Sequence, residues 1–159
     1  VLFLDTEKNF SLERVWQLLT NNDKDCVKNI LVLKLNNFNL QHTQIKNLEN
    51  IKNVSLIVID SITNHYRRLY GREPELAKGM LGKQLSVLNK ISKNNVPVMI
   101  TSQVYSDLKD SINPLGKEIL KRASNKIIRL EKNPRKIIFE KPEKKGLYFD
   151  ILNEGIKIK

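Results

Sequence analysis

Polar side chains that could support chemistry follow three of the apolar runs in this sequence, at the point where each run stops. Asp5-Thr6-Glu7 follows the first run, Asp60-Ser61 the run from Ser55, and Thr101-Ser102-Gln103 the run from Val96. A carboxylate in such a place can hold Mg²⁺ through water, because Mg²⁺ keeps most of its hydration shell. A second carboxylate can orient an attacking water, and an amide can hydrogen-bond a transferred phosphate. The alternative is that polarity simply resumes where a buried strand ends.

Strands and helices that would position these residues alternate along the first part of the chain. Apolar runs of strand length lie at 1–4, 30–33, 55–60 and 96–101. Helical spacing of apolar residues predicts helices at 12–19, 42–51 and 73–93. Apolar strands separated by helices predict an α/β fold with a mainly parallel twisted sheet covered by helices on both faces. Ligands of such sheets bind at the carboxyl ends of the strands, where the three polar clusters would meet.

The helix predicted at 73–93 is the clearest single element. Pro74 suits its first turn, because the first helical N–H has no partner in any case. Its apolar stripe consists of Leu76, Met80, Leu81, Leu85, Leu88 and Ile91. The stripe predicts that this helix packs along its length against the sheet.

The last part of the chain has a different pattern. Short apolar segments lie at 126–130, 136–140 and 147–152, and the turn-forming pairs Asn133-Pro134 and Lys145-Gly146 join them. They predict a short antiparallel meander after the parallel sheet. No internal repeat or low-complexity linker interrupts the sequence, so residues 1–159 are predicted to form one domain.

Composition restricts the class of protein. The chain has 159 residues, with 28 Lys and Arg against 17 Asp and Glu, a formal net charge of +11. No apolar run approaches the ~20 residues that a membrane span needs, and the single cysteine excludes a disulfide framework. The positive charge indicates an anionic partner, with nucleic acid ahead of a membrane surface. The alternative is a genome-wide preference for Lys, Asn and Ile.

The first concentration of charge lies between Asn64 and Arg72, in a stretch that we expect to be loop-like. Arginine pairs with phosphate in a bidentate manner and tyrosine stacks on unpaired bases. The candidate DNA-binding residues here are Arg67, Arg68, Tyr70 and Arg72. The alternative is a solvated helix start with Tyr66 and Leu69 packed inward.

The second concentration of charge runs from 109 to 126. Its candidate DNA-binding residues are Lys109, Lys117 and Lys121. Such contacts would go mostly to phosphate, so binding would depend on salt and little on base sequence. The alternative is an ordinary amphipathic helix at 114–122. A third cluster of lysines, on the meander, is predicted to be solvated edge-strand protection.

In order and spacing, several motifs resemble the RecA/RadA recombinase family, and within it the short archaeal paralogues of RadA. Leu2–Glu7 is similar to the segment that holds the catalytic glutamate, Leu56–Ser61 to the Walker B strand, and Thr101–Tyr105 to the start of the second DNA-binding loop. The likeness continues through Pro114-Leu115-Gly116, Lys126–Lys132, Lys141-Pro142-Glu143 and the segment from Phe149 to Ile156. It covers nearly the whole chain.

The resemblance implies a RecA-like P-loop NTPase core that uses ATP and Mg²⁺. Glu7 would correspond to the residue that activates the hydrolytic water, and Gln103 to the sensor of the γ-phosphate. Asp60 would help to hold Mg²⁺ through water, with Ser61 beside it. The cap that a neighbouring subunit places over ATP would contain Lys141, Pro142 and Glu143.

One family motif is missing. The phosphate-binding loop G-x-x-x-x-G-K-[ST] does not occur, because the pairs Gly82-Lys83 and Gly116-Lys117 lack its other residues. In the family this loop lies just upstream of the strand that begins here at Val1. We therefore expect the P-loop strand and helix to be missing from the N-terminal side of this core, and we expect no hydrolysis by this chain alone. Lys8 also stands where the family often has Gly.

The resemblance implies a role in homologous recombination and DNA repair. It implies binding to DNA, with single strands preferred, and weak or accessory ATPase activity in the complete protein. The implied partners are a RecA/RadA-type recombinase subunit or further copies of the chain, with a cytoplasmic location and no membrane. A KaiC-like ATPase, which would not need the arginines and tyrosines of 65–72, is one alternative. A non-enzymatic basic interaction module is another.

Overall fold

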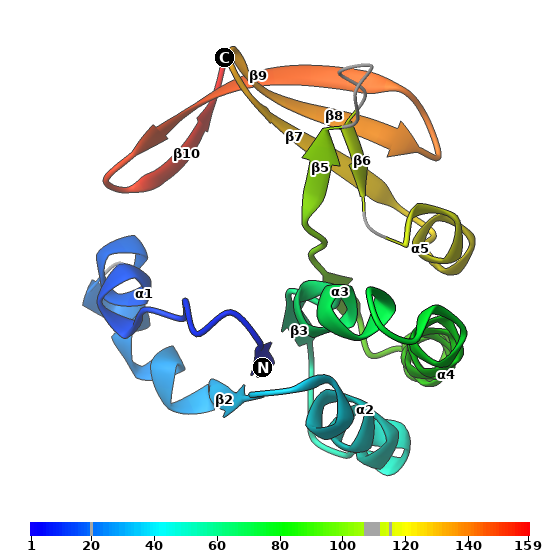
Figure 1. The fold of residues 1–159 in the computed structure, drawn as a ribbon. Coiled ribbons are helices and arrows are strands. Elements are labelled where there is room, and N and C mark those ends of the chain that lie inside the picture. The colour runs from blue at the N-terminus through cyan, green and yellow to red at the C-terminus, as the bar shows by residue number, and fades with distance from the viewer. Residues whose placement is uncertain (20, 107–111, 115) are drawn as a thin grey trace. The chain divides into compact units, whose positions relative to one another are not determined.

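The computed structural model describes residues 1–19, 21–106, 112–114 and 116–159 (Figure 1). The chain divides into two compact units, and each is built from separate stretches of sequence. The first unit comprises residues 1–10 and 28–123, and the second comprises residues 11–27 and 124–159. Among the described residues, no helix is both long enough and apolar enough to cross a membrane.

A four-stranded parallel sheet forms the centre of the first unit. Its strands are β1 (Leu2–Asp5), β2 (Leu31–Lys34), β3 (Ile57–Asp60) and β4 (Val98–Ile100), in the order β2-β1-β3-β4. These are the four apolar runs predicted from the sequence, which confirms the parallel sheet. β4 is shorter than its run and begins only after Pro97, whose nitrogen carries no hydrogen to donate to the ladder.

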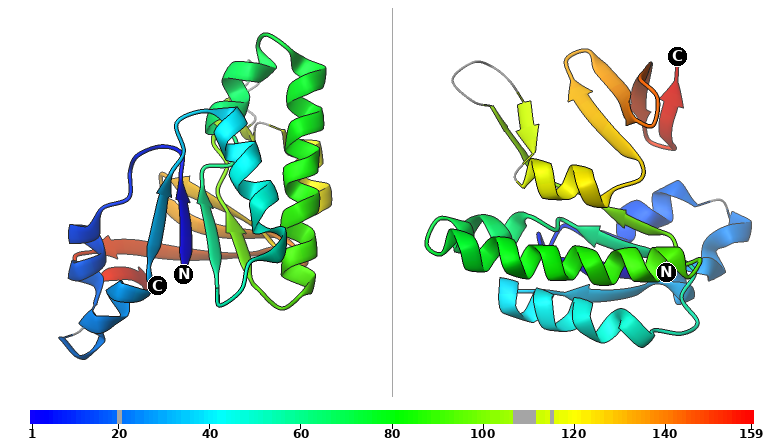
Figure 2. Two further views of the ribbon diagram at one scale, coloured as in Figure 1. Left: turned by 90° about the horizontal axis from the view of Figure 1, so that it is seen from below. Right: turned by 90° about the vertical axis from the view of Figure 1, so that its right-hand side faces the viewer.

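Helices α2 (Phe38–Asn47) and α4 (Pro74–Lys93) lie side by side along one face of this sheet (Figure 2). The predicted helix at 42–51 begins earlier, because the Asn37 side chain accepts a hydrogen bond from the Leu40 N–H at 2.8 Å. It ends in the 3₁₀ helix η2 (Leu48–Asn50). The short helix α3 (Asn64–Tyr70) follows β3 and precedes α4.

The core of the first unit lies between the sheet and these helices. Alternate residues of the central strands point into it, namely Leu2, Leu4, Ile57 and Ile59. From α4 the buried residues are Ala77, Leu81, Gln84, Leu85, Val87, Leu88 and Ile91. Leu76, predicted to be part of the stripe, is 50 % exposed, and Ala77 is buried in the first turn instead.

A buried polar pair joins α2 to α4 inside this core. The Gln41 side-chain amide donates to Gln84 Oε1 at 2.9 Å and to the Ile62 carbonyl at 3.0 Å. Both glutamines are fully buried. Because hydrogen bonds are directional and apolar contacts are not, this pair specifies which residues of the two helices face each other.

A hairpin and a short helix complete the first unit. Strands β5 (Val104–Ser106) and β6 (Ile112–Pro114) pair antiparallel, a hairpin that the sequence pattern did not predict. Helix α5 (Lys117–Ala123) starts later than the predicted helix at 114–122, because Pro114 belongs to β6 and Gly116 has a φ of +71°. A β-carbon at Gly116 would lie 3.3 Å from Leu81, so glycine also allows this close approach.

The second unit contains the predicted meander and one helix. Strands β7 (Ile127–Lys132), β8 (Arg135–Lys141), β9 (Lys145–Leu152) and β10 (Gly155–Ile158) form an antiparallel sheet in the order β10-β9-β8-β7. β10 was not predicted. Helix α1 (Leu12–Leu18) belongs to this unit, and its Arg14 donates hydrogen bonds to the carbonyls of Leu152 and Asn153. The 3₁₀ segment η1 (Asn21–Asn29) continues from the second unit into the first.

Candidate functional site

The carboxyl ends of β1, β3 and β4 bring together the polar clusters predicted from the sequence. Asp5 and Asp60 are paired positions on the neighbouring parallel strands β1 and β3. The Thr101 hydroxyl, which follows β4, donates to Asp60 Oδ1 at 2.5 Å. The other Asp60 carboxylate oxygen accepts no hydrogen bond within the described part of the chain. It is therefore available to a hydrated cation.

Glu7 and Gln103 lie in direct contact at this edge. Gln103 donates from Nε2 to Glu7 Oε1 at 2.8 Å, although the two residues are far apart in the sequence. The Asn9 side chain lies 3.4 Å from the other Glu7 oxygen. Both partners of the close contact are on the surface, so an incoming ligand can reach them. The predicted water-activating residue and the predicted phosphate sensor thus occupy one place.

The turn that carries Glu7 is built by Asp5. The Asp5 side chain is only 1 % exposed. Its Oδ1 accepts the N–H of Lys8 at 2.7 Å and of Asn9 at 3.2 Å, and its Oδ2 accepts the N–H of Phe10 at 3.2 Å. Lys8 adopts the left-handed conformation that glycine would favour, with a φ of 61°. The turn thus forms with Lys8 in the place where the family often has glycine. Its shape is held by the hydrogen bonds to Asp5, which thereby positions Glu7.

Ser61 faces other protein groups in this arrangement. It is 1 % exposed, and its hydroxyl lies 3.3 Å from the hydroxyl of Thr63. Its backbone N–H donates to Thr6 Oγ1 at 2.9 Å, and its carbonyl accepts from the same hydroxyl at 2.8 Å. The peptide bond between Asp60 and Ser61 is cis. The geometry gives Ser61 a supporting place beside Asp60.

Thr63 is a residue of the site that sequence reasoning missed. Its hydroxyl accepts the backbone N–H of Gln103 at 3.2 Å and lies 3.1 Å from the Ser102 hydroxyl. It is fully buried, and it immediately precedes α3. The only signal was a threonine soon after a Walker B-like strand, which is too common to single out. Thr63 ties the backbone of Gln103 to the start of α3.

The segment from Asn64 to Tyr70, expected to be loop-like, is the helix α3. Tyr66 is buried and Leu69 packs against the core, at the helical spacing that the alternative interpretation described. The candidate residues Arg67, Arg68, Tyr70 and Arg72 are nevertheless exposed. Within the described residues, none of the three guanidinium groups has a hydrogen bond or ion pair. Helix α3 therefore presents Arg67 and Arg68 to solvent as charges without a partner among the described residues, and Arg72 does so just after the helix ends.

Tyr70 lies against two neighbouring side chains. Its ring lies 5.3 Å from the ring of Tyr66, and the Lys78 ammonium lies 5.9 Å from its centroid. Lys78 donates a hydrogen bond to Glu75 Oε1 at 2.7 Å, and this contact raises the pKa of Lys78. The Tyr70 ring thus has both Tyr66 and Lys78 beside it, while the residue keeps 36 % of its surface exposed.

Of the second basic segment, the structure describes two of the three candidate residues. Lys117 and Lys121 are exposed on α5, where a spacing of four residues places them on one side of the helix. Each has an interaction within the chain. Lys109 lies outside the described residues. The candidate cap residues Lys141, Pro142 and Glu143 belong to the second unit, where Lys141 donates to the Ser124 carbonyl at 2.6 Å.

The residues at the sheet edge fit Mg²⁺ bound through water. The described residues contain no group of three or more His, Cys, Asp or Glu side chains that could enclose a metal. The edge instead offers Asp60, with one free carboxylate oxygen, and Glu7 on the neighbouring turn. Mg²⁺ commonly uses one or two carboxylates, because its remaining ligands are water and phosphate oxygens. The donor set therefore suits a hydrated Mg²⁺ and does not suit a dehydrated metal centre.

A parallel sheet with these residues at its carboxyl edge, followed by an antiparallel sheet, is a RecA-like fold. The family model described as Rad51 matches residues 1–157, and the chain belongs to the Rad51 family. Curated relatives named "DNA repair and recombination protein RadB" are 37 % identical in Methanococcus maripaludis strain C7 and 36 % identical in Thermococcus sibiricus. Each match covers 99 % of this chain, and 78 % and 74 % of the respective relative.

A solved structure supports the same assignment. The structure named "Crystal structure of the RadB recombinase" matches with a TM-score of 0.79 and 30 % sequence identity. The match covers 98 % of this chain and 76 % of that one. These findings confirm the predicted RecA-like fold and the resemblance to short archaeal paralogues of RadA. The roles of the individual site residues stay predictions.

Proposed function

We propose that this chain acts in DNA repair and homologous recombination in the manner of RadB. It binds DNA, with single strands preferred, and the complete protein binds ATP with Mg²⁺ and has weak or accessory ATPase activity. The observation that carries the proposal is the contact between Gln103 and Glu7 beside Asp60, in a chain of the Rad51 family. A water-activating carboxylate and a phosphate-sensing amide are needed together only where a phosphoryl group is transferred or monitored.

The nucleotide part of the proposal gives each residue a separate task. Asp60 would hold hydrated Mg²⁺ through its free carboxylate oxygen, while the Thr101 hydroxyl keeps the other oxygen oriented. Glu7 would accept a proton from a water, and Gln103 would exchange its contact with Glu7 for a phosphate oxygen. The Mg²⁺ ion would neutralise phosphate charge when bound. The phosphate-binding loop that a P-loop NTPase requires does not occur within residues 1–159.

The DNA part of the proposal rests on α3 and on Arg72, which follows it. Arg67, Arg68 and Arg72 are exposed and unpaired within the described residues, and the buried Thr63 connects the start of the same helix to Gln103. Exposed guanidinium groups without protein partners can pair with phosphates at little desolvation cost. Tyr70 adds a partly exposed aromatic ring on the same helix. The arrangement suits contacts to the backbone and bases of a single strand.

A paired alanine variant tests the DNA part. We expect Arg67→Ala with Arg68→Ala to weaken the binding of a labelled oligothymidine, measured by fluorescence anisotropy over a range of salt concentrations. The slope of log K against log salt should become shallower by about 0.7 for each phosphate that the variant no longer neutralises. The matched control is Lys144→Ala with Lys145→Ala, which removes the same charge from the meander.

The result also separates the alternatives. If both double variants weaken binding equally, the net charge alone binds DNA, which would support a non-specific basic module. If neither does, DNA is bound by residues other than Arg67 and Arg68, and the assignment of these two arginines would be wrong. Selective weakening in the α3 variant is the expected outcome.

The nucleotide part is tested with a phosphate-binding loop present, because residues 1–159 contain no such motif. We expect Asp60→Asn to weaken Mg²⁺-dependent binding of a fluorescent ATP analogue, and Glu7→Gln to leave that binding almost unchanged while lowering any hydrolysis. Glu154→Gln, an exposed carboxylate of the second unit, is the control. If Asp60→Asn bound the Mg²⁺ complex as tightly as the natural sequence does, the assignment of Asp60 would be wrong.

The proposal extends to partners and location. As a RadB-like protein, the chain would associate with a RecA/RadA-type recombinase or with itself, and Lys141, Pro142 and Glu143 would lie at the subunit boundary over ATP. The domain would be a single RecA-like core. Because an archaeal chromosome lies in the cytoplasm, a RadB-like role in DNA repair would put the protein there.

A further inference from the structure

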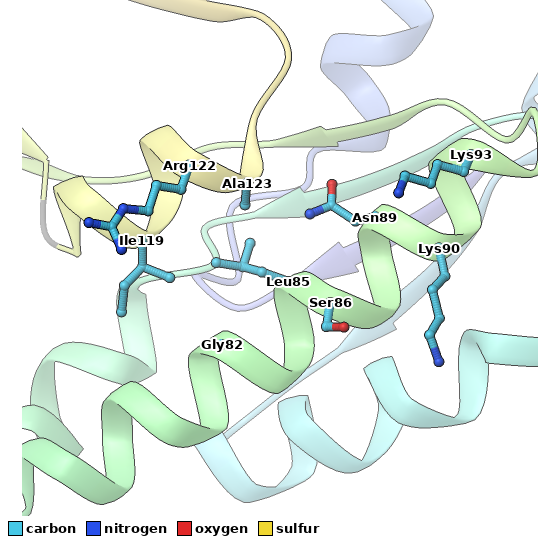
Figure 3. Close-up of a pocket in the computed structure, with 9 residues that line it drawn as sticks. All are labelled: Gly82, Leu85, Ser86, Asn89, Lys90, Lys93, Ile119, Arg122 and Ala123. Atoms are coloured by element: carbon cyan, nitrogen blue, oxygen red, sulfur yellow. The ribbon is translucent and has the colours of Figure 1, made fainter.

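A groove between α4 and α5 in the first unit has no part in the function proposed above. Its volume is about 630 Å³, within the range of clefts that take ligands (Figure 3). The residues that line it are Gly82, Leu85, Ser86, Asn89, Lys90, Lys93, Ile119, Arg122 and Ala123. None of them is acidic.

The floor of the groove is aliphatic. Leu85 is almost fully buried beneath it, while Ile119 and Ala123 of α5 are partly exposed. Helical geometry of about 100° per residue places Ile119, Arg122 and Ala123 on one side of α5, roughly opposite Lys117 and Lys121. The groove therefore uses a different face of α5 from the one that carries the candidate DNA-binding lysines.

The rim of the groove is cationic. Lys90 turns away toward α2 and pairs with Glu49 at 2.7 Å, so its charge is already compensated (Figure 3). Lys93 and Arg122 have no ion pair within the described residues. Two uncompensated positive charges thus stand on either side of an aliphatic floor, with Ser86 and Asn89 as neutral hydrogen-bonding groups between them.

We propose that this groove is a docking site for a short acidic segment of a partner protein, one that carries aliphatic side chains among its carboxylates. The aliphatic side chains would cover Leu85, Ile119 and Ala123, and the carboxylates would meet Lys93 and Arg122. A nucleic acid fits the groove less well, because no lining residue is aromatic and the floor offers nothing to a charged backbone. The proposal does not depend on the DNA or ATP functions.

The test uses the whole chain and a fluorescein-labelled peptide that has leucine at helical spacing among aspartate and glutamate. We expect saturable binding by fluorescence anisotropy, with NMR shift changes concentrated at residues 82–93 and 119–123. Lys93→Glu with Arg122→Glu should weaken binding by about tenfold or more, because each change replaces attraction by repulsion. Lys52→Glu with Lys144→Glu makes the same charge change outside the groove and should have a much smaller effect.

Two further arms keep the proposal open to refutation. Ser86→Trp should obstruct the groove from an exposed position without altering its charge, and a peptide with serine in place of leucine should bind more weakly. Equal weakening by both charge-reversed pairs would overturn the proposal, as would equal binding of the serine peptide. Shift changes in the groove caused by oligothymidine but not by the peptide would show instead a nucleic-acid surface.

Discussion

At the scale of single residues, two carboxylates of one short motif have opposite surroundings. Asp5 is buried and bonded to three backbone N–H groups, whereas Glu7 is on the surface and bonded to side chains only. Sequence spacing put both residues at the strand end but could not separate them. The difference arises from the path of the turn, which is set by the hydrogen bonds themselves.

Asp5 should therefore matter for stability. We expect Asp5→Ala to lower the free energy of unfolding by about 1–3 kcal/mol, because three backbone N–H groups lose their acceptor and the side chain removed is itself buried. Urea denaturation followed by circular dichroism measures this change. Glu7→Ala should cost less than about 0.5 kcal/mol in the same experiment, and equal losses would contradict the division of roles.

His42 provides a prediction about pH. Burial lowers the pKa of His42, and the positive charges of Lys46 and Lys83 lower it further. Its Nδ1 is buried without a partner among the described residues, so protonation adds an unsatisfied donor. A folded pKa below the unfolded value means that the unfolded chain binds the extra proton. The stability contributed by neutral His42 is therefore present above about pH 6.5 and is lost as the pH falls below it.

The measurement is the urea midpoint as a function of pH between about 7.5 and 5. We expect the midpoint of the natural sequence to fall over this window, and that of His42→Gln to fall less. The control is Thr43→Gln, on the exposed neighbouring position of the same helix. A curve for His42→Gln that parallels the natural one would show that other groups dominate the titration.

At the scale of elements, periodicity predicted most of the first unit. The four strands and the body of α4 were readable because their apolar residues recur at the spacing of a buried surface. The predicted helix boundaries were wrong where a capping residue or a glycine sets the start of the helix. Asn37 starts α2 earlier than the apolar pattern does, and Gly116 delays α5. Helix α3 was mistaken for a loop because its charged residues masked the inward spacing of Tyr66 and Leu69.

Two leucines on α4 test how well the apolar periodicity of the sequence predicts which side chains stabilise the fold. Leu81 is fully buried and Leu76 is 50 % exposed, although both belonged to the predicted stripe. We expect Leu81→Ala to lower the free energy of unfolding by about 2–5 kcal/mol, because it removes buried surface and leaves a cavity. Leu76→Ala should change it by less than about 1 kcal/mol. Comparable values would mean that α4 packs differently in solution.

At the scale of the whole molecule, the division into two units was not predictable from the sequence. Residues 11–27 join the C-terminal strands, and the link includes the hydrogen bonds from Arg14 to the turn between β9 and β10. A local pattern contains no information about which distant strand a helix will meet. The strand order β2-β1-β3-β4 could not be predicted for the same reason, because it depends on which strands pair across long stretches of sequence.

The net charge of +11 also belongs to this scale, because any polyanion should be attracted by it. A specific single-strand site would additionally distinguish bases from bare backbone. We expect oligothymidine to bind more tightly than an abasic strand of equal length, and Tyr70→Leu to reduce this difference. Stacking contributes about 1–3 kcal/mol per base. Equal affinity for both strands in the natural sequence would leave charge as the only determinant.

The hydroxyl of Thr63 has a consequence for sequence variation among relatives. It is buried together with Ser61, and it meets the hydroxyls of Ser61 and Ser102 and the backbone N–H of Gln103. A larger side chain at any of positions 61, 63 and 102 would need a smaller one at another, and removal of one hydroxyl would need removal of its partner. These positions should therefore covary across the family, as a set that links the carboxyl edge of the parallel sheet to the helix that carries Arg67 and Arg68.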